Sequence, residues 1–167
     1  MKIIIFMLLT SCASYKVNNI NVYDKQLTNP MSKKEGKALI NSAIRSTKIL
    51  GFTDSDKFFK NWDIIFMSDW LGIYGPNNTI GIADGVTNYE NKIIYLKVHD
   101  CFWHSAILHE MMHALIFHKT GSKESYYHPH KGKIWNKVKS LNIKIRKKMC
   151  PLDYNPRKQA PRKVKRI

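Results

Sequence analysis

At 167 residues the chain has the length of one domain, and its 44% hydrophobic content excludes wholesale disorder. Its formal net charge of +16 indicates attraction to something anionic, such as nucleic acid, an anionic lipid surface or another acidic polymer. A Lys- and Asn-rich composition with solvated lysines gives the same excess, so charge alone does not select a partner.

The first twelve residues, MKIIIFMLLTSC, carry one Lys, an apolar run from Ile3 to Leu9, and Thr-Ser before Cys12. The run is too short to cross a bilayer, which takes about 20 residues, and is typical of a secretory signal. The segment resembles a bacterial lipoprotein signal. That resemblance implies a signal peptide over residues 1–11, a lipid on Cys12 and anchoring to a membrane of the cell envelope, on the periplasmic or outer surface. The alternative is a buried first strand in a cytoplasmic protein.

Residues 12–30 are polar and Asn-rich and end in Pro30, which predicts a tether. The remaining cysteines, Cys101 and Cys150, are not spaced as a metal-binding pair. They either form a disulfide, which an oxidising envelope would permit, or stay as two thiols.

The first predicted helix begins after Ser32, which is spaced with Glu35 as a capping box, and ends at Gly51. Strands are predicted at residues 62–67, 79–83 and 91–98, with turns between them that are rich in Gly, Asn and Pro. A helix over residues 102–119 follows, with Asp100 as its cap and Gly121 as its end.

A basic amphipathic helix is predicted over residues 133–148, and the Pro-broken, basic segment 150–167 is predicted to be a disordered tail. The order of elements predicts one α+β domain over residues 31–149, with a small mixed sheet and flanking helices.

The segment ILHEMMHAL contains His109 and His113 four residues apart, with Glu110 directly after the first. Positions i and i+4 share one face of a helix, so both imidazoles can bind one zinc ion. Glu110 lies beside this pair without being a ligand, as a general base requires. The alternative is an ordinary pair of core or surface histidines.

A catalytic zinc ion has three protein ligands, so one more is expected downstream. His118 comes five residues after His113 and points away from the pair. Glu124 lies in a loop with no helix to hold it. His130 precedes a helix that can pack on the domain and is the favoured third ligand, with His128 as the alternative.

The residues of this region resemble the SprT-like group of zincin metallopeptidases over about residues 60–148. The matching positions are His109, Glu110, His113, Ala114, His130, Gly132 and Trp135. In that group the Gly directly follows the third His, whereas Lys131 intervenes here. The resemblance implies a minimal zincin-like fold and a zinc-dependent endopeptidase that acts on a protein or peptide.

The implied chemistry is hydrolysis of a peptide bond with Glu110 as the general base. Tyr126 and Tyr127 are candidates for stabilising the oxyanion. An extended substrate is expected along an edge strand formed by residues 79–83 or 93–98.

Two other functions fit the same residues. One is a non-catalytic envelope lipoprotein with a structural zinc site, for which Glu110 has no use. The other is a cytoplasmic SprT-like protease that acts on DNA-associated proteins. The lipoprotein signal argues against contact with nucleic acid, and an exported chain would use its basic tail on anionic lipid or an envelope polymer.

Overall fold

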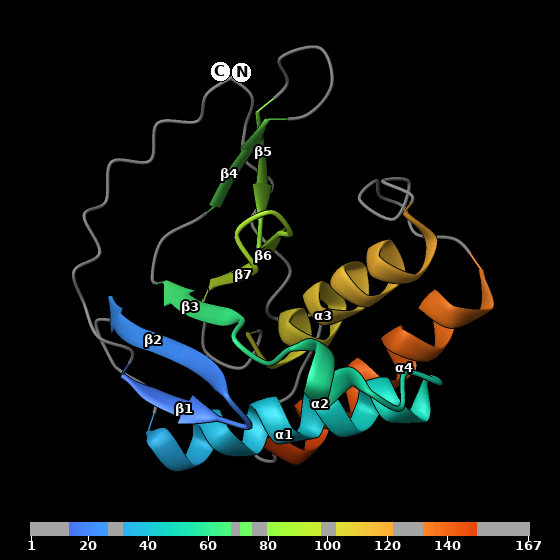
Figure 1. The fold of residues 1–167 in the computed structure, drawn as a ribbon, viewed down its shortest axis with the longest axis horizontal. Coiled ribbons are helices and arrows are strands. Elements are labelled where there is room, and N and C mark those ends of the chain that lie inside the picture. Colours follow the sequence, from blue (N-terminus) through green and yellow to red (C-terminus); the bar gives the residue numbers. More distant parts are fainter. Residues whose placement is uncertain are drawn as a thin grey trace.

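In a computed structural model, the structure describes residues 14–26, 32–67, 71–74, 80–97, 103–121 and 132–149 (Figure 1). These residues form seven strands and four helices: β1 (Tyr15–Val17), β2 (Ile20–Gln26), α1 (Lys33–Ile49), α2 (Ser55–Phe58), β3 (Asp63–Met67), β4 (Leu71–Tyr74), β5 (Ile80–Ala83), β6 (Gly85–Asn88), β7 (Ile93–Lys97), α3 (Trp103–Thr120) and α4 (Lys133–Met149). Within these ranges, no helix has the length and apolar character needed to cross a membrane.

The main sheet has five strands in the order β1-β2-β3-β7-β6. Strands β2, β3 and β7 are parallel, whereas β1 and β6 run antiparallel to their neighbours at the two edges. Strands β4 and β5 form a separate antiparallel hairpin. The predicted α+β fold with a small mixed sheet is confirmed.

One face of the main sheet carries the core; α1 and α3 pack on this face, and α4 packs on α1 and α3 (Figure 1). Because side chains alternate along a strand, Ile64 and Phe66 of β3 point to the helices together with Ile94 and Leu96 of β7. The buried residue Ile65 lies outside this core cluster, as its position on the opposite face requires.

Helix α1 begins and ends where local chemistry predicts. The Ser32 hydroxyl accepts a hydrogen bond from the Glu35 amide at 3.2 Å, and the Glu35 carboxylate accepts one from the Ser32 amide at 3.0 Å. Gly51, with a φ of 96°, follows the last turn, a conformation that residues with a Cβ disfavour.

Helix α3 is apolar on nearly all sides because it lies between the sheet and the other helices. Its buried apolar residues are Ala106, Ile107, Leu108, Met111, Met112, Ala114 and Leu115. Helix α4 buries only a stripe that includes Val138 and Ile145, so its other sides remain available to solvent.

The tether predicted for residues 12–30 is wrong for the described residues 14–26, because these form the β1–β2 hairpin. Asn18 and Asn19 have φ values of 48° and 65°, and two positive φ values are what a tight hairpin turn requires. Tyr15 and Val17 are buried on one side of this turn and Ile20 and Val22 on the other. Because Lys and Asn residues separate these four apolar positions, the sequence of the segment is typical of a polar tether.

The strand that could pair with an extended substrate also differs from the prediction. Residues 93–97 form β7, which lies between β3 and β6 and is therefore not an edge. Residues 80–83 form β5, which pairs with β4 outside the main sheet. The edge strand of the main sheet beside α3 is β6.

Candidate metal centre

Helix α3 brings together His109, Glu110 and His113, as an HExxH motif on a helix requires. A nitrogen of each imidazole and an oxygen of the carboxylate lie within 4.8 Å of one another. Glu110 and His113 are 6% and 5% exposed, and His109 is half-buried. Among the described residues, this is the group of side chains able to hold a metal ion.

The two imidazoles point their Nε2 atoms at each other, 3.1 Å apart. Two ligands of a tetrahedral zinc ion, each about 2.05 Å from the metal, lie about 3.3 Å apart. The spacing of His109 and His113 therefore fits a metal of this size with little movement of either ring.

Glu110 is held by the edge strand β6. The Thr87 hydroxyl lies 2.8 Å from the Glu110 Oε2 atom and 3.0 Å from the Glu110 carbonyl oxygen, so either oxygen can accept its one proton. Gly85, two residues earlier on the same strand, makes room for this carboxylate, because a Cβ at Gly85 would lie 2.6 Å from the Glu110 Cγ atom. Strand β6 thus fixes where the carboxyl group lies.

Burial raises the pKa of Glu110 from 4.5 to about 7, because ionisation is unfavourable away from water. The Thr87 hydrogen bond lowers the pKa, since a donated proton stabilises the carboxylate, but this effect is the smaller one. A carboxyl group with a pKa near neutrality can both accept and return a proton at physiological pH.

Trp135 of α4 covers the histidine pair. Its ring centroid lies 5.2 Å from that of His109 and 5.1 Å from that of His113. Helix α4 therefore supplies an aromatic wall to the site, which restricts both rings. The sequence singled out Trp135 only through its match to the aromatic position of SprT-like proteins.

His118 lies away from the pair, as its spacing predicts: it is exposed, and its ring contacts Phe58 at a centroid distance of 4.8 Å. The other predicted site residues lie outside the described residues. They are Cys12, Glu124, Tyr126, Tyr127, His128 and His130, and with them lie Asp100, Cys101 and Cys150.

Gly85 and Thr87 are site residues that the sequence analysis missed. Their separation of two places them on one face of a strand. This spacing indicates that Gly85 and Thr87 face the same neighbouring element. Their contact with Glu110 depends on how β6 lies against α3, which the local sequence does not encode.

No protein-family model matches the chain, and neither a curated protein nor a solved structure matches it significantly.

Proposed function

We propose that the protein is a zinc-dependent metallopeptidase that hydrolyses peptide bonds at the His109–Glu110–His113 site. The observation that carries the proposal is the convergence of these three side chains on α3, with Glu110 buried. Two imidazoles and an adjacent carboxylate are the donor set of zincin metallopeptidases.

His109 and His113 would hold the metal ion, with His130 as the proposed third ligand and His128 as its alternative. Nitrogen donors at tetrahedral spacing favour zinc over calcium or magnesium, which prefer oxygen ligands. When bound there, zinc would supply a Lewis acid and lower the pKa of water towards neutrality.

Glu110 would act as the general base. It follows a ligand directly, and its carboxyl group is fixed by Thr87 beside the imidazole pair. In the proposed reaction Glu110 accepts a proton from the attacking water and returns it to the leaving amine. A structural zinc site would gain nothing from a buried carboxyl group directly beside its ligands, so this residue favours catalysis over a structural role.

Strand β6 supports a peptide as the substrate. It is the edge of the main sheet beside the candidate metal centre, and Gly85 and Thr87 on it contact Glu110. An extended peptide can pair its main chain with an edge strand, which would bring one of its carbonyl groups past the site. Tyr126 and Tyr127 remain the proposed stabilisers of the oxyanion.

We also propose that the chain acts in the cell envelope, anchored by a lipid on Cys12. This proposal rests on the resemblance of residues 1–12 to a lipoprotein signal. Metabolic labelling with a lipid precursor tests it: the wild-type chain should incorporate label and Cys12→Ser should not. If the wild-type chain incorporates no lipid label and is found in the cytoplasm, the alternative of a DNA-associated SprT-like protease is favoured.

The direct test of the metallopeptidase is metal analysis of the purified chain beside a peptide-cleavage assay with and without a chelator. The chain should hold one zinc ion, cleave the peptide and lose cleavage with the chelator. His109→Ala and His113→Ala should each lose zinc, whereas the matched His118→Ala variant should retain it.

The same assay assigns the third ligand. His130→Ala should weaken zinc binding while His128→Ala does not, and the reverse result would transfer the role to His128. A chain that binds no zinc, or cleaves equally well with chelator, would refute the proposed function.

A further inference from the structure

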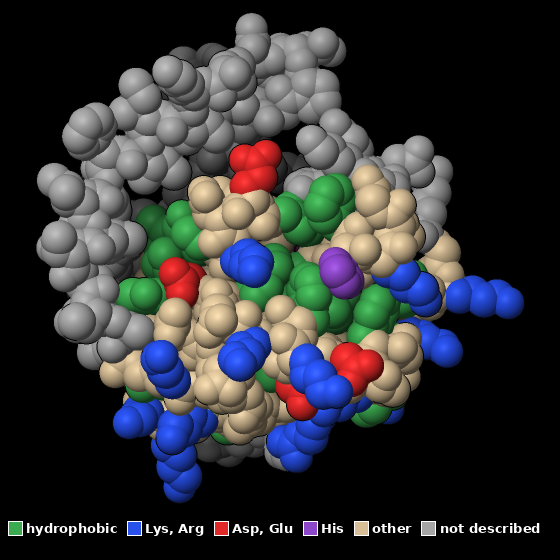
Figure 2. Space-filling model, in the orientation of Figure 1, with side chains coloured by type: hydrophobic (Ala, Val, Ile, Leu, Met, Phe, Trp, Pro, Cys, Tyr) green, Lys and Arg blue, Asp and Glu red, His purple; other side chains and the backbone are tan. Residues whose placement is uncertain are grey.

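The positive charge of the chain concentrates on α4 and on the adjoining α1. Helix α4 contains seven Lys or Arg residues, and residues 125–152 contain no Asp or Glu. Helix α1 contains five Lys or Arg residues and a single acid, Glu35. In the view of Figure 2, Lys and Arg side chains gather over the lower half of the molecule, where Figure 1 places α1.

A hollow of about 370 Å³ lies between these two helices. Leu50 and Leu141, both partly buried against the core, form its apolar floor, while Lys137, Lys144 and Ile49 stand at its rim. We refer to these five residues as the α1/α4 groove. Among the described residues, no carboxylate lies within ion-pair distance of Lys137 or Lys144.

Ile49 is the most exposed large apolar side chain among the described residues, at 71%. The next is Ile143 at 38%, which adjoins Lys144 on α4. An exposed isoleucine between lysines suits a headgroup boundary, where lysines contact phosphate and the apolar side chain enters the acyl region.

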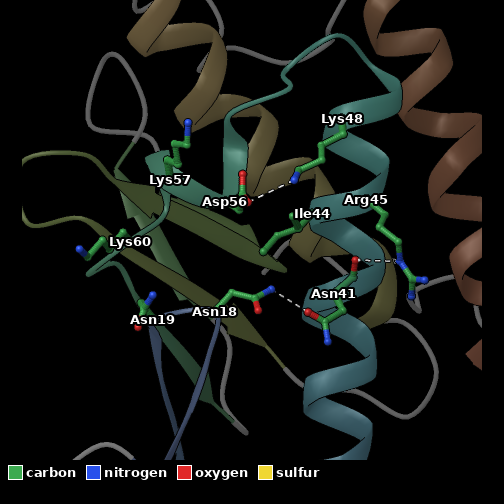
Figure 3. Close-up of a pocket in the computed structure, with 9 residues that line it drawn as sticks. All are labelled: Asn18, Asn19, Asn41, Ile44, Arg45, Lys48, Asp56, Lys57 and Lys60. Atoms are coloured by element: carbon green, nitrogen blue, oxygen red, sulfur yellow. Dashed lines mark hydrogen bonds and ion pairs between the residues drawn. The ribbon is translucent and has the colours of Figure 1, made fainter.

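A larger hollow of about 640 Å³ lies on the other side of α1, and two of its four cations form ion pairs (Figure 3). Lys48 pairs with Asp56 and Lys57 with Asp54, each at 3.2 Å. The apolar residue that lines this hollow, Ile44, is only 4% exposed, so the hollow lacks the exposed apolar side chain that Ile49 gives the α1/α4 groove.

The α1/α4 groove faces away from the candidate metal centre. Successive residues of an α-helix are rotated by about 100°, so Lys137 and Lys144 lie about 160–180° from Trp135 around α4. Trp135 packs on His109 and His113. A surface bound at the groove would therefore leave the histidine pair turned away from it.

We propose that the α1/α4 groove docks the protein on an anionic lipid bilayer. Lys137 and Lys144 contact headgroup phosphates, and Ile49 enters the boundary with the acyl chains. The exposed isoleucine favours a bilayer over nucleic acid, and the groove has no aromatic side chain on which a base could stack. This docking does not depend on hydrolysis or on the first twelve residues.

The test is co-sedimentation of the full chain with phosphatidylcholine vesicles that contain or lack phosphatidylglycerol. The wild-type chain should bind better when the anionic lipid is present. Each lysine near an anionic surface contributes about five- to sixfold to binding, so the double variant Lys137→Gln/Lys144→Gln should bind about 30-fold more weakly. Ile49→Ser should also weaken binding, with a loss that persists at high salt.

The matched control is Lys16→Gln/Lys92→Gln, which removes two exposed lysines from the sheet side of the molecule. This control should keep most of the wild-type affinity, and thermal melts should show that all variants fold. An equal loss in the control would overturn the proposal, as would unchanged binding of Ile49→Ser. Loss of duplex-DNA binding, with vesicle binding retained, in Lys137→Gln/Lys144→Gln would make the groove a nucleic-acid surface instead.

Discussion

Glu110→Gln is expected to remove a pH-dependent loss of stability from the chelator-treated protein. The buried Glu110 carboxyl group has a pKa of about 7, against 4.5 for an ordinary glutamate. Gln has nearly the same shape and keeps an oxygen that can accept the Thr87 hydrogen bond, but it does not ionise. A comparison of the two proteins therefore isolates the ionisation of this side chain.

The direction of the change in the free energy of unfolding with pH follows from proton binding to Glu110. Between pH 4.5 and 7 the folded wild-type chain keeps the Glu110 proton while the unfolded chain releases it, so the free energy of unfolding falls as pH rises. One pKa unit corresponds to about 1.4 kcal/mol, and the rise to about 7 therefore gives a loss of roughly 3 kcal/mol across this interval. The stabilising contribution is complete below pH 4.5 and is lost by about pH 7.

Urea unfolding at a series of pH values measures this loss. The free energy of unfolding of Glu110→Gln minus that of the wild-type chain should increase by roughly 3 kcal/mol from pH 4.5 to 7 and then level off. Both proteins contain the same histidines, so histidine titration contributes similarly to both curves. If the free energies of unfolding of the two proteins differ by a constant amount from pH 4.5 to 7, the idea that the Glu110 carboxyl group is desolvated on α3 is refuted.

Three further substitutions test the surroundings of the site and the fold. Thr87→Val removes the hydroxyl that lowers the pKa of Glu110, so the acidic limb of the pH–rate profile should move to higher pH, and Thr87→Ser should restore it. Gly85→Ala places a Cβ 2.6 Å from the Glu110 Cγ atom, so a kinetic assay should show a kcat at least about tenfold lower at unchanged zinc content. Ser32→Ala removes the N-cap of α1 and should lower the free energy of unfolding by about 1 kcal/mol, measured against Ser42→Ala within the same helix.

The parts of the fold that the sequence predicted best are those set by local chemistry. The capping box at Ser32 and Glu35 and the glycine after the last turn define α1 without reference to any other element. The spacing of His109 and His113 likewise places both imidazoles on one side of α3, because a helix has a fixed period. In these cases the necessary contacts lie within a few residues of one another.

The parts that the sequence did not predict depend on distant segments. The β1–β2 hairpin looked like a tether because each strand has few apolar residues, and β2 becomes stable by pairing with β3, some forty residues later. Strand β6 was not recognised as the edge because strand order follows from packing of the whole sheet. The contact of Gly85 and Thr87 with Glu110 is a consequence of that order.

The central claim, hydrolysis at a zinc site with Glu110 as the base, is tested most directly by peptide cleavage with zinc-loaded Glu110→Gln. That variant keeps the proposed ligands, so it should bind as much zinc as the wild-type chain. Loss of a general base should reduce its cleavage rate by roughly 10²–10⁴-fold. Cleavage at the wild-type rate with equal zinc content would contradict the claim.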